Sequence, residues 1–374
     1  MVNYYNTIEF KEKRNWQCQN RIDNLLVILP EYCKRFDSWA KAKYVIKTRM
    51  EYLQDIYTFF FFLSKKKKLS SIKEISLSQL EALNGFDFDE YLEWLTEYKF
   101  DENDEFEKAK HNSLVTKKRK IASLRTFFHF LYIRDLINCN PSEKAEMPDI
   151  KRKNKKDILI LTDEERKVFL EHINHCLSSA RIEASYNTER AKSKRIQLKP
   201  ALILRDKAII HLFLSTGLRL AELCAIDCED ISFQLGCINV IRKEDSDEDS
   251  TTDKVYPHED VMKLLQEYIY HARDMISPNT DHYDALFISN VHSRMTPRAI
   301  ELMVKKYAEA ALGKNCGITP HKLRASFGTR YYLETGDIFA TSSAMNHSSV
   351  DVTAANYIND ADIAKKRVAN IPIN

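Results

Sequence analysis

The sequence contains little glycine and proline, with 7 Gly and 9 Pro among 374 residues. Collagen-like, low-complexity and disordered chains are rich in such residues, so composition excludes these classes. The chain is instead 44% apolar and 30% charged, which is typical of a globular protein. So few turn-forming residues in so long a chain favour long helices.

Long apolar runs are also missing. The run of four phenylalanines and a leucine at residues 59–63 is far too short to span a bilayer. The first residues lack the basic and then apolar pattern of a secretory signal peptide. We therefore expect a cytoplasmic protein that does not insert into membranes.

Metal-binding and nucleotide-binding signatures are absent from the sequence. The eight cysteines lack C-x-x-C spacing, which favours buried thiols over disulfides or zinc sites. The single metal-like cluster, His172, His175 and Cys176, is explained equally well by a charged helix face. There is no Walker A motif, no G-x-G-x-x-G and no H-E-x-x-H, so nucleotide hydrolysis, dinucleotide redox chemistry and zinc proteolysis lack their signatures. We expect no cofactor and no metal.

The length of the chain predicts two domains, because one hydrophobic core rarely serves 374 residues. Residues 140–157 carry two prolines and a basic stretch without apolar periodicity, which is typical of an exposed connector. We therefore expect a first domain at 1–145, a basic linker at 146–157 and a second domain at 158–374.

Positive charge is concentrated in the first half of the chain. Residues 1–156 hold 30 Lys and Arg against 23 Asp and Glu, whereas residues 157–374 hold 27 against 31. Any one basic run could simply solvate a turn, but three separate runs suit an extended polyanion such as nucleic acid. The candidate DNA-binding residues are Lys65, Lys66, Lys67, Lys68, Lys117, Lys118, Arg119, Lys120, Arg125, Lys151, Arg152 and Lys153.

Helical periodicity dominates the first half. Thr48 and Glu51 have capping-box spacing ahead of an apolar stripe, which predicts a helix over residues 48–63. A second helix is predicted over residues 116–135, where a polar face that includes Lys118 could contact phosphates. Further helices are expected around residues 22–36 and 87–98. No strand pattern stands out, so the first half predicts an all-helical bundle.

The second half predicts helices with a small sheet. Thr162 and Glu165 form a capping box for a helix that ends near Cys176. The polar segment 178–199 predicts an elaborated loop before a helix at 201–214. Short strands are expected at 236–242, 255–257 and 285–289, too few for a doubly wound sheet. The expected fold class is therefore mainly α, with two domains and a small antiparallel β-sheet in the second.

Three segments of the second half carry residues suited to phosphate chemistry. Arg219 follows a glycine break and opens a helix, where backbone donors favour anions. His321 and Arg324 share one face of a helix that a proline begins, and together they could hold one phosphate. The third segment offers a histidine and a phenol, His347 and Tyr357. Taken singly, each of these residues could equally be structural.

The order and spacing of these segments resemble the tyrosine recombinase family, and within it the Xer-type single recombinases. Residues 216–222 are similar to the family's first arginine motif, and residues 321–324 to its H-x-x-R box. His347 and Tyr357 are similar to its closing histidine and its nucleophile, and Lys243 to the lysine of its hairpin. The helical first half resembles the family's core-binding domain.

The resemblance implies strand transfer without metal or ATP. Two arginines would neutralise the phosphate while Tyr357 attacks it, giving a 3′-phosphotyrosyl link and a free 5′-hydroxyl. His321 would accept or relay the tyrosine proton, Lys243 would protonate the leaving oxygen, and His347 would hydrogen-bond the phosphate. Two rounds of exchange would pass through a Holliday junction. The implied catalytic set is Arg219, Lys243, His321, Arg324, His347 and Tyr357.

Two features depart from the family pattern. Lys243 precedes an acidic stretch, residues 244–249, which DNA would repel. Lys254 on the returning strand is therefore an alternative general acid, and the acidic stretch could contact protein instead. Asn346 replaces the usual glycine, and Tyr357 stands one residue later than usual.

The resemblance also implies partners and a role. The substrate would be a double-stranded DNA recombination site, and the amphipathic tail at 360–371 would dock on a neighbour in a homotetramer on two such sites. A protein activator is a further candidate partner. We expect chromosome dimer resolution, with integration or excision of a mobile element as the alternative. A type IB topoisomerase and an inactive DNA-binding protein are two further alternatives.

Overall fold

A computed structural model describes residues 4–100, 109–148, 161–242 and 251–346 of the chain. Contacts divide the chain into two compact units. The N-terminal unit comprises residues 8–153, and the C-terminal unit comprises residues 154–374 together with residues 1–7. Each unit has its own hydrophobic core.

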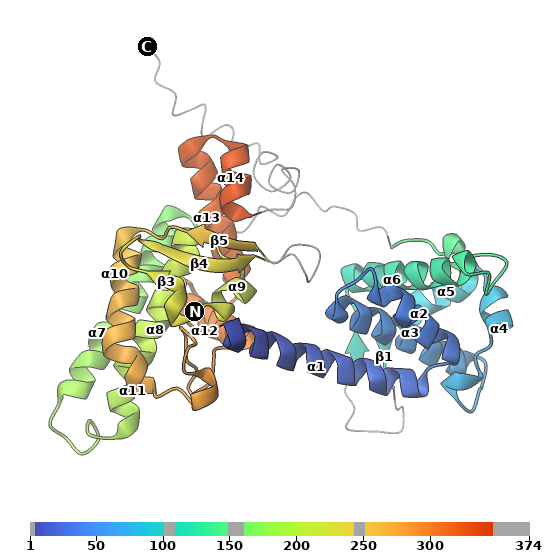
Figure 1. The fold of residues 1–374 in the computed structure, drawn as a ribbon, viewed down its shortest axis with the longest axis horizontal. Coiled ribbons are helices and arrows are strands. Elements are labelled where there is room, and N and C mark those ends of the chain that lie inside the picture. The colour runs from blue at the N-terminus through green and yellow to red at the C-terminus, as the bar shows by residue number, and fades with distance from the viewer. Residues whose placement is uncertain (1–3, 101–108, 149–160, 243–250, 347–374) are drawn as a thin grey trace, which may run out of the picture. The chain divides into compact units, whose positions relative to one another are not determined.

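The N-terminal unit is a helical bundle (Figure 1). Its α-helices are α1 (Tyr4–Ile28), α2 (Glu31–Lys41), α3 (Ile46–Lys66), α4 (Leu77–Glu81), α5 (Gly85–Trp94) and α6 (Leu114–Ile133), with short 3-10 helices at Ile72–Glu74 and Pro141–Lys144. The sequence predicted an all-helical bundle, but the structure also contains a pair of strands. Two very short strands, β1 (Glu97–Tyr98) and β2 (Lys110–His111), pair antiparallel.

Two helix boundaries in this unit differ from the sequence prediction. The helix expected over residues 22–36 is broken at Pro30, which cannot donate a backbone hydrogen bond and lies just before α2. The capping box predicted at Thr48 and Glu51 is wrong, because α3 already begins at Ile46 and its N-cap residue makes no side-chain bond. Tertiary packing of the aromatic face, rather than a cap, accounts for this helix.

Aromatic rings fill the core of the N-terminal unit. Phe59 of α3 stacks on Phe88 of α5 with ring centroids 5.6 Å apart. Phe36 of α2 meets Phe127 of α6 edge to face at 5.3 Å. All of these rings are fully buried, and pairs of this geometry stabilise a core beyond the area that they bury. Residues 59, 60, 62 and 63 of the run that is too short for a membrane are buried in this core.

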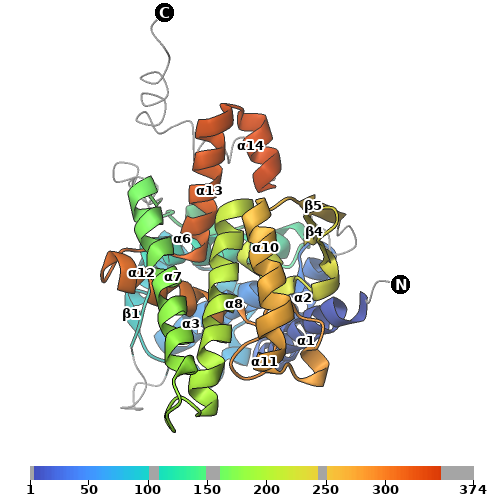
Figure 2. The ribbon, with the colours of Figure 1, turned by 90° about the vertical axis from the view of Figure 1, so that its left-hand side faces the viewer.

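The C-terminal unit packs its helices around α8, with a small sheet at one side (Figure 2). Its main elements are α7 (Asp163–Ser185), α8 (Lys194–Thr216), α9 (Leu220–Ala225), β3 (Ile231–Ser232), β4 (Cys237–Arg242), β5 (Thr251–Val255), α10 (Glu259–Tyr268), α11 (Asp274–Ile276), α12 (Pro297–Leu312), α13 (Pro320–Thr335) and α14 (Ile338–Met345). Single turns lie at Cys228–Asp230, Ile269–Arg273 and Thr280–His282. The expected fold class, mainly α with a small antiparallel sheet, is confirmed.

The sheet has the order β3-β4-β5 and is antiparallel throughout. The strand predicted at residues 285–289 is not formed, and only isolated bridges join Ala285 to Asp227 and Ile288 to Arg294. The side chain of Arg273 donates to the carbonyl of Ala285, with Nε at 3.1 Å. An arginine therefore satisfies a carbonyl that a strand neighbour would otherwise bind.

Helices α7 and α8 form a hairpin longer than the sequence predicted. The capping box of Thr162 and Glu165 is present, but α7 continues nine residues past Cys176, to Ser185. Leu177 and Ala180 are buried, so the apolar stripe of the helix continues into the segment expected to be a loop. Of the segment 178–199, which was expected to be a loop, only residues 186–193 lie outside helices.

Within the described residues, no helix is long and apolar enough to cross a membrane. All eight cysteines are free thiols, and Cys33, Cys224 and Cys237 are buried. The described part of the chain holds no cluster of three or more residues suited to a metal ion. Sγ of Cys176 lies 3.5 Å from Nε2 of His172, so this pair is bonded within one helix face.

Candidate active site

Arg219 is held between two helices by the local sequence. Helix α8 ends at Gly217, whose left-handed conformation, with φ of 60°, turns the chain into α9. Arg219 is the N-cap residue of α9, and its backbone N–H donates to Oε2 of the buried Glu222 at 2.7 Å. Nη1 of the same arginine donates to Oε1 of Glu222 at 2.9 Å. One carboxylate therefore fixes both the backbone and the side chain of Arg219.

Arg324 and His321 lie on the first turns of α13. Thr319 caps this helix by accepting from Lys322 N at 3.3 Å, and a proline occupies its first position. Arg324 is only 6% exposed. Its Nη1 donates to the carbonyl of Gly217, so it links α13 to the turn that places Arg219.

The C-terminus of α14 joins the two arginines. Asn346 caps α14 in the left-handed conformation, with φ of 45°. The carbonyl of Asn346 accepts from Nη2 of Arg219, and the carbonyl of Met345 accepts from Nη2 of Arg324. The last carbonyls of a helix lack intrahelical donors and carry partial negative charge, so they suit guanidinium groups. Three segments far apart in the sequence therefore meet at one pair of cations.

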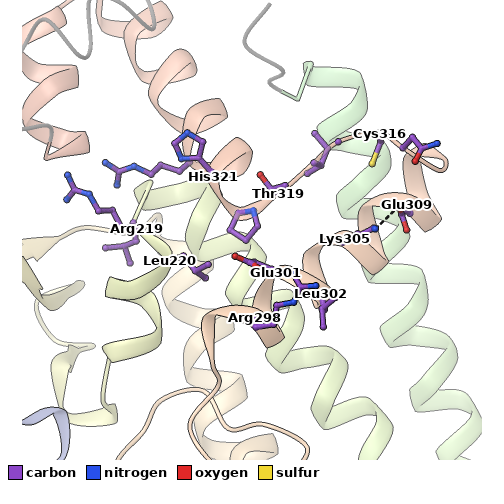
Figure 3. Close-up of a pocket in the computed structure, with 16 residues that line it drawn as sticks. Arg219, Leu220, Arg298, Glu301, Leu302, Lys305, Glu309, Cys316, Thr319 and His321 are labelled. Atoms are coloured by element: carbon purple, nitrogen blue, oxygen red, sulfur yellow. Dashed lines mark hydrogen bonds and ion pairs between the residues drawn. The ribbon is translucent and has the colours of Figure 1, made fainter. Parts of the chain in front are cut away.

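Arg219, His321 and Arg324 line one cleft of about 930 Å³ (Figure 3). Helix α12 forms another wall of this cleft, with charged side chains that include Arg298 and Glu301. Guanidinium and imidazole groups that converge on an open cleft match the donor set that an anionic ester needs.

The surroundings of the His321 ring lower its pKa. Partial burial, and then the cations of Lys322 and Arg324, lower the pKa of His321 below its ordinary value of 6.5. The ring is therefore mainly uncharged at pH 7 and has a lone pair that can accept a proton.

Three of the six expected catalytic residues, Lys243, His347 and Tyr357, lie outside the described residues. The alternative acid, Lys254, lies on β5 opposite Asn239 of β4. It is exposed, and it is not among the described residues that line the cleft.

The basic run at residues 117–120 differs from its expected role. Lys117 and Lys120 are buried rather than turned to solvent. Nζ of Lys117 donates to the carbonyl of Leu92 at 2.6 Å, and Nζ of Lys120 donates to Asp55 at 2.9 Å. A buried ammonium is stable only with such partners, so these two lysines tie α6 to its neighbours in the bundle.

The other candidate DNA-binding residues divide into three groups. Three of them are engaged by the protein: Arg119 binds Asp55, Arg125 donates to the carbonyl of Ala145, and Lys66 pairs with Asp87 and Glu90. Four are exposed, namely Lys65, Lys67, Lys68 and Lys118. The remaining three, Lys151, Arg152 and Lys153, lie outside the described residues.

Sequence reasoning missed the backbone half of this site. The carbonyls of Gly217, Met345 and Asn346 accept the arginine donors, and α12 forms a wall of the cleft. A carbonyl has no residue-specific signal, so only the tertiary arrangement reveals it. The helix α12 itself could have been found from Thr296 and Pro297, which cap and begin it.

A family model and the sequences of known proteins indicate the same kind of protein for this chain. The model of the phage integrase family matches residues 193–363. Tyrosine recombinase XerS of Lactococcus lactis subsp. lactis is 27% identical over 368 residues, covering 91% of this chain and 95% of that protein. Tyrosine recombinase XerC of Shewanella amazonensis is 30% identical over 233 residues, covering 62% of this chain and 66% of that protein.

Solved structures share the fold. The XerH site-specific recombinase bound to its difH substrate superposes with a TM-score of 0.56 at 19% identity, covering 96% of this chain and 93% of that one. The Tn1549 transposon integrase in complex with circular intermediate DNA also gives 0.56 at 19% identity, covering 90% and 98%. Both of these structures are complexes with DNA.

Proposed function

We propose that this chain, which belongs to the phage integrase family of tyrosine recombinases, cuts and rejoins duplex DNA at a specific site through a 3′-phosphotyrosyl intermediate. The observation that carries the proposal is the convergence of Arg219, Arg324 and His321 on one cleft. Enzymes of this family transfer DNA strands, and the donors in this cleft suit that chemistry.

The two arginines would stabilise the transition state. Charge builds on the non-bridging oxygens of the phosphate as the nucleophile approaches, and planar guanidinium donors bind such oxygens most strongly at that stage. Glu222 holds Arg219 in place, and Gly217 holds Arg324, so the donors are positioned before substrate arrives.

Tyr357 would supply the nucleophile. Its phenolic oxygen forms a bond to phosphorus while the bond to the 5′-oxygen breaks, so the number of ester bonds is unchanged and no ATP is needed. His321, with its lowered pKa, would take the phenolic proton. His347 would donate a hydrogen bond to the phosphate. The 5′-hydroxyl of a second duplex would then attack the phosphotyrosine and exchange strands.

A suicide substrate tests the nucleophile. A nick beside the scissile phosphate lets the short fragment that carries the freed 5′-hydroxyl diffuse away, so cleavage accumulates as a covalent protein–DNA adduct. We expect an adduct with the natural chain and none with Tyr357→Phe. Tyr331→Phe is the matched control, because Tyr331 packs beside Phe327 in α13 and should leave the yield unchanged. An adduct with Tyr357→Phe would refute the assignment.

The general acid is either Lys243 or Lys254. A substrate with sulfur at the bridging 5′ position distinguishes them, because a thiolate leaves without a proton, whereas an alkoxide does not. The lysine whose replacement by alanine is rescued by the sulfur substrate is the acid. Arg219→Ala should not be rescued, since it removes charge stabilisation rather than a proton.

The proposed biological role is chromosome dimer resolution of the Xer kind, in the cytoplasm. The match to XerS over nearly the whole of both chains supports it. The partner would be a double-stranded recombination site, with a homotetramer assembled on two sites through the 360–371 tail and with a protein activator as a candidate. Integration or excision of a mobile element remains the alternative, and scoring recombinant against relaxed plasmid products also separates recombination from topoisomerase activity.

A further inference from the structure

A second cavity lies at the tip of the hairpin formed by α7 and α8. Its volume is about 590 Å³, and its charged lining residues are Arg190, Arg195, Lys199, Lys306 and Glu183. We call it the tip cavity. Four cations and one carboxylate therefore surround one hollow, three of the cations coming from the hairpin and Lys306 from α12.

The tip of this hairpin is basic, whereas the second half of the chain as a whole is acidic. Residues 181–199 hold six Lys and Arg against two Glu, although residues 157–374 as a whole hold more acidic than basic residues. Glu183 accepts from Nζ of Lys199 at 2.7 Å and lies 3.7 Å from Arg190. Within the described residues, Arg195 and Lys306 have no acidic partner. The cavity thus retains positive charge that its own carboxylate does not neutralise.

The tip cavity is separate from the catalytic cleft. Arg298, Glu301 and Lys305 of α12 line the cleft, whereas Lys306, the next residue, lines the tip cavity. Successive residues on a helix point about 100° apart, so Lys305 and Lys306 face different hollows. In Figures 1 and 2 the tip of the hairpin lies at the opposite end of α7 and α8 from α13 and α14.

We propose that the tip cavity binds the phosphate backbone of duplex DNA at a place away from the scissile phosphate. This inference rests on the recombinase function above and adds a second DNA contact to it. Arginine, lysine and serine side chains make most protein contacts to DNA phosphates, and Ser193 also lines the cavity. Protein interfaces instead centre on aromatic anchors, and no aromatic residue is among the described residues that line this cavity.

Binding measurements over a series of salt concentrations test the proposal. The variant is Arg195→Gln with Lys306→Gln in the full chain, and the matched control is Arg181→Gln with Lys263→Gln, which removes the same charge from exposed positions outside the cavity. Affinity is measured by fluorescence anisotropy on a duplex that carries the recombination site with long flanks and on the bare site. On the flanked duplex, we expect the magnitude of the negative slope of log affinity against log salt to decrease by about two for the variant. The slope of the control should stay unchanged.

The outcomes are distinct. A slope that does not change, or that falls equally in the control, overturns the proposal. Loss of binding by a second protomer with an unchanged slope for the first also overturns it and assigns the cavity to a contact between copies of the chain. All four residues are exposed, so folding is checked by comparing melting temperatures. Adduct formation at saturating protein should be unchanged in the variant, whereas failure of the recombinase function would abolish the adduct in the natural chain.

Discussion

Gly217 adopts the left-handed conformation at the turn that supports both arginines. A Cβ atom built there would lie 2.3 Å from Cδ1 of Phe327, so the ring would have to move. At the scale of single residues, this glycine therefore has two constraints, its φ angle and its close contact with α13. The same turn supplies the carbonyl that Arg324 binds, so strain here should reach the active site.

We expect Gly217→Ala to lower the free energy of unfolding by about 2–5 kcal/mol, combining left-handed strain with overpacking. Gly236→Ala is the control, because Gly236 has a similar φ of 63° but open space around it, so it should lose only about 1–2 kcal/mol. Urea denaturation measures both. Equal losses in the two variants would show that the contact with Phe327 is not a constraint.

His321 gives a prediction for pH. Because burial and neighbouring cations lower its pKa below 6.5, the neutral form that can accept a proton is present at pH 7 and is lost as the pH falls through the lowered pKa. The rate of adduct formation should therefore decline only at a pH below the ordinary histidine pKa of 6.5, and it should follow a single protonation. In His321→Gln the acidic decline should vanish along with most of the rate, while His129→Gln, exposed on α6, should retain both. A decline that persists in His321→Gln would assign the proton to another group.

At the scale of elements, Asp55 explains how α3 and α6 are joined. Its side chain is 1% exposed and accepts from Arg119, Lys120 and Ser123 of α6, with the Ser123 hydroxyl at 2.7 Å. A carboxylate this deeply buried is stable because each oxygen has donors. The positive run of α6 is thus partly a structural counterpart to one acid of α3.

We expect Asp55→Asn to lower the free energy of unfolding by about 3–5 kcal/mol, because it leaves the buried ammonium of Lys120 without its counter-charge. Glu90→Gln is the control, since Glu90 pairs with Lys66 at the surface and should cost less than about 1 kcal/mol. Chemical denaturation of the two variants gives the comparison. A loss below 1 kcal/mol for Asp55→Asn would mean that the network contributes little.

At the scale of the whole molecule, the two units have separate cores, so each should fold by itself. We expect residues 8–153, expressed alone, to unfold cooperatively in urea and to bind DNA with a strong salt dependence, but to form no adduct. A gradual transition without a baseline would show that this bundle needs the rest of the chain. The full chain, assayed in parallel, provides the reference for both properties.

The sequence predicted features that depend on local patterns and missed those that depend on distant partners. The apolar stripe of α6 and the Thr162 cap of α7 are visible within a few residues, and both are present. Pro30 is an equally local signal, yet the apolar periodicity continues on both sides of it and predicts one helix where the structure has two. The burial of Lys117 and Lys120 depends on acceptors in α3 and α5 and the segment after α5, so no local pattern could show it.

The helix end that bonds both arginines has one more consequence. Met345 and Asn346 present carbonyl oxygens to the same nitrogens that a phosphate would need. The guanidinium groups are thus bonded to protein oxygens, and under the proposed mechanism an incoming phosphodiester would replace one acceptor with another. Such an exchange would leave the planes of both side chains already oriented, which would reduce the rearrangement between DNA binding and bond breaking.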